Sequence, residues 1–225
     1  MDFCSGTGCI ALLLYTLLQS SFPALNVRGI DISRRAINLS RENIRRNIAR
    51  GHMPAPSVPG QSIRFDLGDI FSPDWQERLF PDEARCDILI SNPPYISASG
   101  FARDTARSVR NHEPKLAQVP VSRERDRKHG ELEEDVFYSR LLEMGEVLGP
   151  NIMLFEVGGA AQARRVAGMV QGHRYMDGWV TEIWRDWPDA IPEEDECRSV
   201  TINGRDVAVK GSGHERSVLV YKNMP

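Results

Sequence analysis

Residues 2–12 read Asp-Phe-Cys-Ser-Gly-Thr-Gly-Cys-Ile-Ala-Leu, a glycine turn that leads directly into an apolar helical pattern. Glycine lets a ligand approach the backbone, and the N-terminus of the following helix offers free N–H groups and the positive end of a dipole. Many helices begin this way, and the stretch lacks both the full dinucleotide glycine pattern and a Walker lysine. It predicts a strand–turn–helix unit with a candidate ligand site at the turn.

Acidic residues follow at the ends of two later apolar stretches. Residues 27–31 read as a short buried strand ending in Asp31, at close to the roughly 20-residue spacing typical of a carboxylate that binds a ribose hydroxyl. Asp31 is equally a candidate cap for the next helix, and both roles are compatible. Further on, Asp69 could accept from an adenine amine while Phe71 covers the ring, although a lone phenylalanine is more often part of the core.

The four residues Asn92-Pro93-Pro94-Tyr95 follow the apolar run 88–91. Two prolines remove two backbone N–H groups and fix φ, so the carbonyls of Asn92 and Pro93 point out of a stiff turn. An amine or amide docked there can donate to the Asn92 side-chain oxygen and the Pro93 carbonyl. The alternative is that the prolines merely end a strand. For the tetrapeptide alone the two interpretations have comparable weight.

In this order, the stretches resemble the HemK/PrmC family of release-factor glutamine methyltransferases, which are class I S-adenosylmethionine-dependent enzymes. The resemblance runs from residue 1 to about residue 170 and then thins. Asn-Pro-Pro-Tyr is shared with methyltransferases that act on base amines, and Ile96 with the Glu113-Pro114 segment narrows the match to protein glutamine. The residues that carry it are 2–8, Asp31-Ile32-Ser33 with Ala36 and Asn43, 68–71, 91–96, Glu113-Pro114 with Leu116-Ala117, and 155–158.

The resemblance implies S-adenosyl-L-methionine as cofactor and, as substrate, a glutamine in the Gly-Gly-Gln motif of a peptide chain release factor. No metal, no membrane and no sequence-specific nucleic acid is expected. His112 and Glu156 are candidate accessory groups. The cofactor is assigned to Cys4, Gly6, Thr7, Gly8, Asp31, Ile32, Asp69, Ile70, Phe71 and Asn92; the substrate to Asn92, Pro93, Pro94, Tyr95 and Glu113; and methyl transfer to Asn92, Pro93 and Tyr95.

Alternating strand and helix patterns predict a single α/β domain over residues 1–225, a Rossmann-like doubly wound sheet that is mostly parallel with an antiparallel last strand. Only Met1 precedes Asp2, so we expect the first strand to be largely missing and the family's N-terminal helical domain to be lacking. Helices are expected near 8–20, 33–50, 132–148 and 160–171, and strands near 26–31, 62–67, 86–91, 151–157, 175–184 and 215–222. Asn203-Gly204 suggests an irregular excursion or a hairpin.

Residues 98–130 hold eight Lys or Arg and four acids, with no clear apolar period. A long unstructured stretch inside a domain is usually functional or disordered. One interpretation is a lid and docking surface beside the reacting nitrogen. The other, a solvated loop, has equal weight for residues 118–130. The arginines of the helix over 33–50 are expected to form a solvated face.

Composition bounds the function further. The chain has 225 residues, 41% of them hydrophobic, and a net charge of −3, which disfavours a general nucleic-acid coat. No apolar run is long enough to span a membrane. The four cysteines lack zinc spacing and fall mostly in stretches expected to be buried, so a reducing compartment is the simplest interpretation. The resemblance favours mitochondria, with the bacterial cytoplasm as the alternative.

Two other classes of function stay open. An amino methyltransferase for a base of RNA or DNA would share the Asn-Pro-Pro-Tyr corner and would need to stack a flipped base. A non-catalytic remnant that only binds a partner is favoured by the short first strand.

Overall fold

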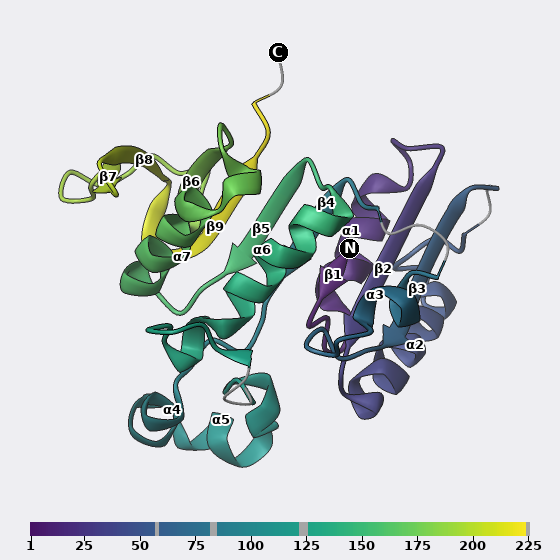
Figure 1. Cartoon of the computed structure of the whole chain (residues 1–225). Coiled ribbons are helices and arrows are strands. Elements are labelled where there is room, and N and C mark those ends of the chain that lie inside the picture. The colour runs from purple at the N-terminus through teal and green to yellow at the C-terminus, as the bar shows by residue number, and fades with distance from the viewer. Residues whose placement is uncertain (57–58, 82–84, 122–125, 224–225) are drawn as a thin grey trace. The chain divides into compact units, whose positions relative to one another are not determined.

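The computed structural model describes residues 1–56, 59–81, 85–121 and 126–223. It divides into two compact units, an N-terminal unit of Met1–Ala84 and a C-terminal unit of Arg85–Pro225 (Figure 1). The expectation of a single domain stays a prediction.

The N-terminal unit has a parallel sheet in the order β3-β2-β1. Phe3 of β1 pairs with Ile30, and Asp31 at the end of β2 pairs with Leu67 at the end of β3. The carboxyl ends of the strands therefore meet at one edge, where ligands of α/β sheets bind. As expected, the first strand is very short. The strands are β1 (Asp2–Phe3), β2 (Leu25–Asp31) and β3 (Gln61–Leu67).

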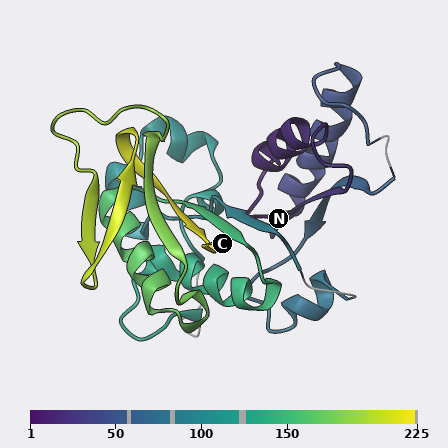
Figure 2. The same cartoon turned by 90° about the horizontal axis from the view of Figure 1, so that it is seen from above.

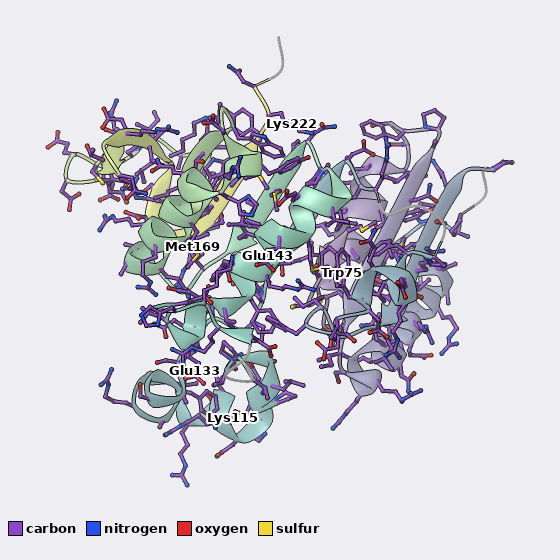
Figure 3. The ribbon with its side chains drawn as sticks, viewed as in Figure 1. Trp75, Lys115, Glu133, Glu143, Met169 and Lys222 are labelled. Atoms are coloured by element: carbon purple, nitrogen blue, oxygen red, sulfur yellow. The ribbon has the colours of Figure 1, made fainter. Side chains whose placement is uncertain are left out.

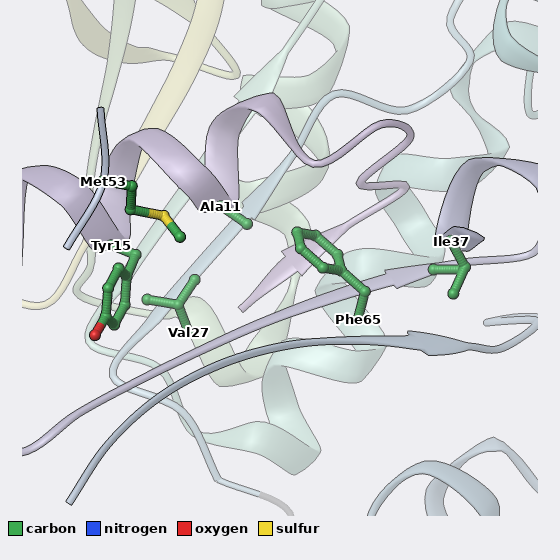
Figure 4. Packing of buried hydrophobic residues seen from close by; sticks show 6 residues of the cluster. All are labelled: Ala11, Tyr15, Val27, Ile37, Met53 and Phe65. Atoms are coloured by element: carbon green, nitrogen blue, oxygen red, sulfur yellow. The ribbon is translucent and has the colours of Figure 1, made fainter. Parts of the chain in front are cut away.

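Two predicted helices of this unit are confirmed, α1 (Cys9–Leu18) and α2 (Arg34–Ala49). Both pack against the same face of the sheet, where Ala11 and Tyr15 of α1 meet Val27, Phe65 and Ile37 (Figure 4). A third helix, α3 (Trp75–Leu79), is too short for the sequence pattern to reveal. Its last residue, Leu79, packs on Gly68, since a Cβ there would lie 2.6 Å from the Leu79 side chain.

The buried and exposed faces of α1 and α2 differ in kind. The apolar pattern of α1 is real, but the helix buries Ala11 and Tyr15 and leaves Leu13 and Leu17 exposed, because the small and the aromatic residue fit the sheet. The arginines of α2 are all exposed, as expected of a solvated face. Arg41 donates to the backbone oxygen of Phe65 (2.6 Å), so it ties the helix to β3.

The C-terminal unit has a mixed sheet in the order β4-β5-β9-β6-β8-β7. β4 and β5 are parallel, and β9 is antiparallel to both of its neighbours, which confirms the predicted antiparallel last strand. β6 begins later than expected, because a 3-10 turn, η4 (Arg174–Met176), occupies the start of the predicted range. The strands are β4 (Ile88–Ser91), β5 (Ile152–Glu156), β6 (Val180–Trp187), β7 (Ser199–Ile202), β8 (Arg205–Lys210) and β9 (Ser212–Tyr221).

The Asn203-Gly204 pair makes a hairpin rather than an irregular excursion. It joins β7 to β8, which pair in antiparallel register with Ile202 opposite Arg205. Both loop residues have positive φ, 50° and 76°, as a two-residue type I′ turn requires. The turn residues predicted the hairpin, but the two short strands beside it carry too little apolar pattern to be foreseen.

The two long predicted helices of this unit are confirmed as α6 (Val136–Leu148) and α7 (Ala160–Gly172). They contact each other, and α7 packs on β6 and β9 (Figures 1 and 2). A 3-10 turn, η3 (Glu133–Asp135), leads into α6.

Much of the stretch expected to lack regular structure is helical. It forms α4 (Ala98–Asp104), α5 (Arg107–His112) and the 3-10 turn η1 (Lys115–Ala117). Arg110 donates to the Ala102 oxygen (2.6 Å) and the Lys115 ammonium lies over the Phe101 ring, so basic residues hold these short helices together. Local contacts of this kind leave no apolar period in the sequence. Arg123, Glu124 and Arg125 lie outside the described residues.

The cysteine expectation was wrong in one respect. All four are free, and none is buried: Cys4 and Cys86 are half-buried, while Cys9 and Cys197 are exposed. Cys9 begins α1 on its outer side, and Cys197 lies in the connection that precedes β7. Among the described residues, no helix combines the length and apolar character needed to cross a membrane.

Candidate functional site

The glycine turn of the N-terminal unit connects β1 to α1 through three residues of positive φ: Cys4 (59°), Gly6 (52°) and Gly8 (85°). The two glycines have different environments. A Cβ on Gly8 would lie 2.5 Å from the Phe65 ring, whereas a Cβ on Gly6 would meet nothing within 4 Å. Gly8 therefore allows the turn to pack on β3, and Gly6 leaves open space beside the backbone.

Asp31 fastens this turn to the end of β2. Its Oδ2 accepts from the Gly6 N–H (2.8 Å) and its Oδ1 from the Ser33 N–H (2.7 Å). The helix cap of α2 is Ser33, whose hydroxyl accepts from Ala36 N–H (3.3 Å), so the alternative of Asp31 as the cap is wrong. Each carboxylate oxygen keeps a second lone pair, which leaves Asp31 able to accept from a hydroxyl group.

The segment after β3 places Asp69 and Phe71, both half-buried, at the same edge of the sheet. Asp69 accepts from the Phe71 N–H through Oδ1 (2.9 Å), which makes a tight turn and leaves its Oδ2 for a donor. The neighbouring Ile70 is only 5% exposed, so its side chain belongs to the core. Ile32, in contrast, is 52% exposed immediately after Asp31. An exposed apolar side chain beside a carboxylate is suited to cover a ring.

Sequence reasoning missed Asp2, although an acid directly before a glycine turn was a visible signal. Asp2 is 1% exposed and its Oδ2 accepts from the Ala11 N–H (3.2 Å) at the start of α1. Burial raises the pKa of this carboxyl from 3.8 to about 7. Asn43, one of the residues that carried the resemblance, donates to the Thr7 oxygen (3.0 Å) and ties α2 to the outer side of the turn.

The acceptor corner of the C-terminal unit begins where β4 ends. Pro93 and Pro94 are buried, whereas Asn92 is exposed. Within the described residues the Asn92 side chain has no hydrogen-bond partner. A rigid backbone thus presents an amide group that is free to bind a ligand.

Tyr95 is held against the loop that follows β5. Its hydroxyl donates to Glu156 Oε1 (3.2 Å), and its ring lies so close to Gly158 that a Cβ there would be 3.2 Å away. Burial, followed by the charge of Glu156, raises the pKa of the Tyr95 phenol to about 12. At neutral pH the phenol is therefore a hydrogen-bond donor and not a base.

Glu113 connects to the same corner through a neighbour. The Ile96 N–H donates to the Gln118 oxygen (2.9 Å), and the Gln118 side chain donates to Glu113 Oε2 (2.6 Å). Glu113 and His112 are both exposed. The predicted substrate residues from 92 to 113 are thus linked within one unit.

Sequence reasoning also missed Gln162, a buried glutamine of α7 that donates to the Tyr95 oxygen (3.3 Å). It lies 67 residues from Tyr95 in the chain, so no local pattern connects the two. The cofactor residues predicted from Cys4 to Phe71 belong to the N-terminal unit, and Asn92 to the C-terminal unit. Among the described residues no group of three or more His, Cys, Asp or Glu is placed to hold a metal ion.

Known proteins of similar sequence indicate which family the chain resembles. The chain matches no protein-family model. It is 30% identical over 181 residues, 75% of this chain, to the probable MRF1 mitochondrial N(5)-glutamine methyltransferase mtq1 of Schizosaccharomyces pombe. It is 36% identical over 119 residues, 52% of this chain, to the mitochondrial MRF1 N(5)-glutamine methyltransferase MTQ1 of Saccharomyces cerevisiae.

A bacterial relative is the ribosomal protein uL3 glutamine methyltransferase of Burkholderia pseudomallei, 29% identical over 117 residues and 52% of this chain. The chain spans half or less of these three curated relatives, 50%, 32% and 33% of their lengths in this order. The resemblance to release-factor glutamine methyltransferases is thereby confirmed.

The fold has a counterpart among solved structures. The hMettl16 catalytic domain, in complex with the MAT2A 3'UTR hairpin 1, has a TM-score of 0.51 and 13% sequence identity, covering 99% of this chain and 63% of that chain. At this identity the likeness shows the methyltransferase fold alone. The predicted α/β fold class is confirmed.

Proposed function

We propose that the chain is a methyltransferase domain that transfers a methyl group from S-adenosyl-L-methionine to the side-chain amide nitrogen of a glutamine, in the Gly-Gly-Gln motif of a peptide chain release factor. One observation carries the proposal: the unpartnered Asn92 side chain stands on a corner of two buried prolines. The relatives named for glutamine methylation support the choice of acceptor.

The residues of the N-terminal unit fit the cofactor. Gly6 leaves open space at its α-carbon, the start of α1 offers backbone N–H groups, and Asp31 and Asp69 keep acceptor capacity for hydroxyl and amine groups. Cys4, Thr7, Gly8, Ile32, Ile70 and Phe71 complete the proposed binding segment. The bound cofactor would supply a methyl group activated by a sulfonium.

The acceptor residues work by orientation. A carboxamide nitrogen is a poor nucleophile because its lone pair is delocalised into the carbonyl. With one N–H donated to the Asn92 side-chain oxygen and the other to the Pro93 carbonyl, the nitrogen is fixed in one direction, and part of the entropic cost of the reaction is met on binding. The same two acceptors stabilise the positive charge that develops on the nitrogen, as an oxyanion hole stabilises the opposite charge.

Tyr95 shapes this corner without acting as a base. Its phenol stays protonated because of its raised pKa, and its bond to Glu156 fixes the ring. Methyl transfer leaves the amide nitrogen positively charged and strongly acidic, so its extra proton can pass to water and restore a neutral amide. Glu113, through Gln118, supports the backbone at Ile96 and is placed to contact a protein substrate.

The decisive test is a choice of substrates. The purified chain, with radiolabelled S-adenosyl-L-methionine, is given a release-factor fragment containing Gly-Gly-Gln, the same fragment with Gly-Gly-Asn, ribosomal protein uL3, and total RNA. We expect label in the first fragment alone. Label in uL3 would retain glutamine methylation and change the substrate, label in RNA would favour the base methyltransferase, and label in none would favour the remnant.

We also propose a mitochondrial location, because the two yeast relatives are named as mitochondrial proteins. Cell fractionation of the native protein, followed by detection with an antibody, would test it. Recovery with the cytosolic fraction would overturn this part of the proposal.

A further inference from the structure

Gln162 is a glutamine in the first turn of α7 and is only 6% exposed. Its Oε1 accepts from the Gly158 N–H at 2.7 Å. Its Nε2 donates towards three oxygens: Asp135 Oδ1 (2.9 Å), Glu134 O (3.0 Å) and Tyr95 O (3.3 Å). Both ends of this buried amide are therefore satisfied, which is the condition under which a buried polar group rigidifies its surroundings.

These contacts bring three distant segments together. Tyr95 belongs to the corner after β4, Gly158 to the loop after β5, and Asp135 to η3, where the neighbouring Glu133 is labelled in Figure 3. Tyr95 is consequently held at two ends. Its backbone oxygen is bound by Gln162 and its hydroxyl by Glu156.

The orientation of the amide is fixed by a charged neighbour. Asp135 is 1% exposed and is bound by Arg165, which lies one turn further along α7 and donates from both Nε and Nη2. A carboxylate only accepts, so it requires the Nε2 side of Gln162. The Gly158 N–H requires the Oε1 side. A flipped amide would break both contacts.

We propose that Gln162 is a positioning residue for methyl transfer: by fixing the backbone of Tyr95 it sets the direction of the Asn92 and Pro93 acceptors. The inference rests on the proposed function. Gln162 touches neither substrate nor cofactor and acts through Tyr95. Its effect should fall on the chemical step, because a misplacement of about 1 Å can cost on the order of 100-fold in rate.

The test compares Gln162→Leu with Gln171→Leu. Gln171 lies at the other end of α7, and its Oε1 has no hydrogen-bond partner among the described residues, so its loss controls for a general effect on the helix. We expect Gln162→Leu to lower kcat by roughly 10- to 100-fold. The dissociation constant of S-adenosylhomocysteine and the far-UV spectrum should match those of the wild type, and Gln171→Leu should keep its kcat.

A second variant, Gln162→Glu, replaces the amide by a carboxyl group of nearly the same size and shape. A neutral carboxyl can accept from Gly158 and donate to Asp135, whereas an ionised one would repel the aspartate. The ratio of variant to wild-type kcat should therefore rise as the pH is lowered. Any of three results would overturn the inference. The kcat ratio of Gln162→Glu to wild type could be independent of pH, or Gln162→Leu could keep a kcat within twofold of wild type. The third is an equal loss of kcat in Gln162→Leu and Gln171→Leu.

Amide hydrogen exchange separates this inference from the proposed function, because it needs no substrate. In Gln162→Leu, exchange at the Gly158 N–H should quicken by about 10-fold, the equivalent of one lost hydrogen bond. If the wild type methylates no glutamine, the proposed function fails, and the exchange rates still decide whether Gln162 holds the corner. An unchanged exchange rate at the Gly158 N–H in Gln162→Leu would overturn the inference that Gln162 holds the corner.

Discussion

The glycine turn of the N-terminal unit and the Asn-Pro-Pro-Tyr corner of the C-terminal unit both follow a parallel strand, but different contacts hold them. The turn is held mainly through its backbone, with the Gly6 N–H on Asp31, the Gly8 N–H on Ser5 and the Ser5 N–H on Ile30. The corner is held mainly by groups from later in the chain: the backbone oxygen of Gln118 and the side chains of Glu156 and Gln162.

This difference separates two tasks. A turn held through its backbone offers N–H groups to a ligand, which suits binding. A corner held by groups from distant segments has one geometry, which suits the orientation of a weak nucleophile. Substitutions in the two regions should therefore fail in different ways, and the following predictions are ordered from the largest expected effect to the smallest.

Asn92→Ala should abolish methyl transfer, with kcat/KM lowered by on the order of 1,000-fold or more, because an acceptor for the developing charge is lost. Affinity for S-adenosylhomocysteine, measured by calorimetry, should stay within a few-fold of wild type. Full activity in this variant would remove the basis for the acceptor corner.

Asp2 should make the stability of the N-terminal unit depend on pH. Since folding raises the carboxyl pKa from 3.8 to about 7, the folded state binds the proton more tightly, and the free energy of unfolding should fall as the pH rises between those values. Across this range the free energy of unfolding should fall by on the order of 4 kcal/mol in total. Urea unfolding across this range measures it. Asp2→Asn should flatten the dependence, and an equal slope in both proteins would contradict the assignment.

Gly8→Ala should destabilise the N-terminal unit by about 3 kcal/mol, because the new methyl would overlap the Phe65 ring and the residue has a φ of 85°. Gly6→Ala is the matched control. It shares the positive φ but meets open space, so it should cost only about 1 kcal/mol. Thermal unfolding compares the two, and Phe65→Leu should partly rescue Gly8→Ala. Equal losses would show that backbone conformation alone matters.

Asp31→Ala should do the reverse of Asn92→Ala. It removes the acceptor of the Gly6 N–H and the proposed ribose contact, so affinity for S-adenosylhomocysteine should fall by about 10- to 100-fold, or roughly 1.4 to 2.8 kcal/mol. At saturating cofactor, kcat should be within a few-fold of wild type. Asp31→Asn keeps one acceptor oxygen, so its affinity for S-adenosylhomocysteine should lie between those of the wild type and Asp31→Ala. A loss confined to kcat would reverse the roles assigned to Asp31 and Asn92.

Most of the regular elements could be predicted, because their signals are local. The periodicity of α2, the apolar run of β4 and the Asn203-Gly204 turn each lie within a few neighbouring residues. The failures were elements without such a signal. α4 and α5 are short helices held by contacts such as Arg110 to Ala102, and α3 spans a single turn.

The sequence by itself determined where the candidate site lies: a glycine turn, acids at strand ends and a proline corner, each of which restricts the backbone through its own chemistry. Only the tertiary structure decided what holds these residues. It placed Phe65 against Gly8 and Gln162 beside Tyr95, and it buried Asp2. The physical reason is that burial and side-chain contact depend on how distant segments pack, whereas turns and strand ends depend on adjacent residues.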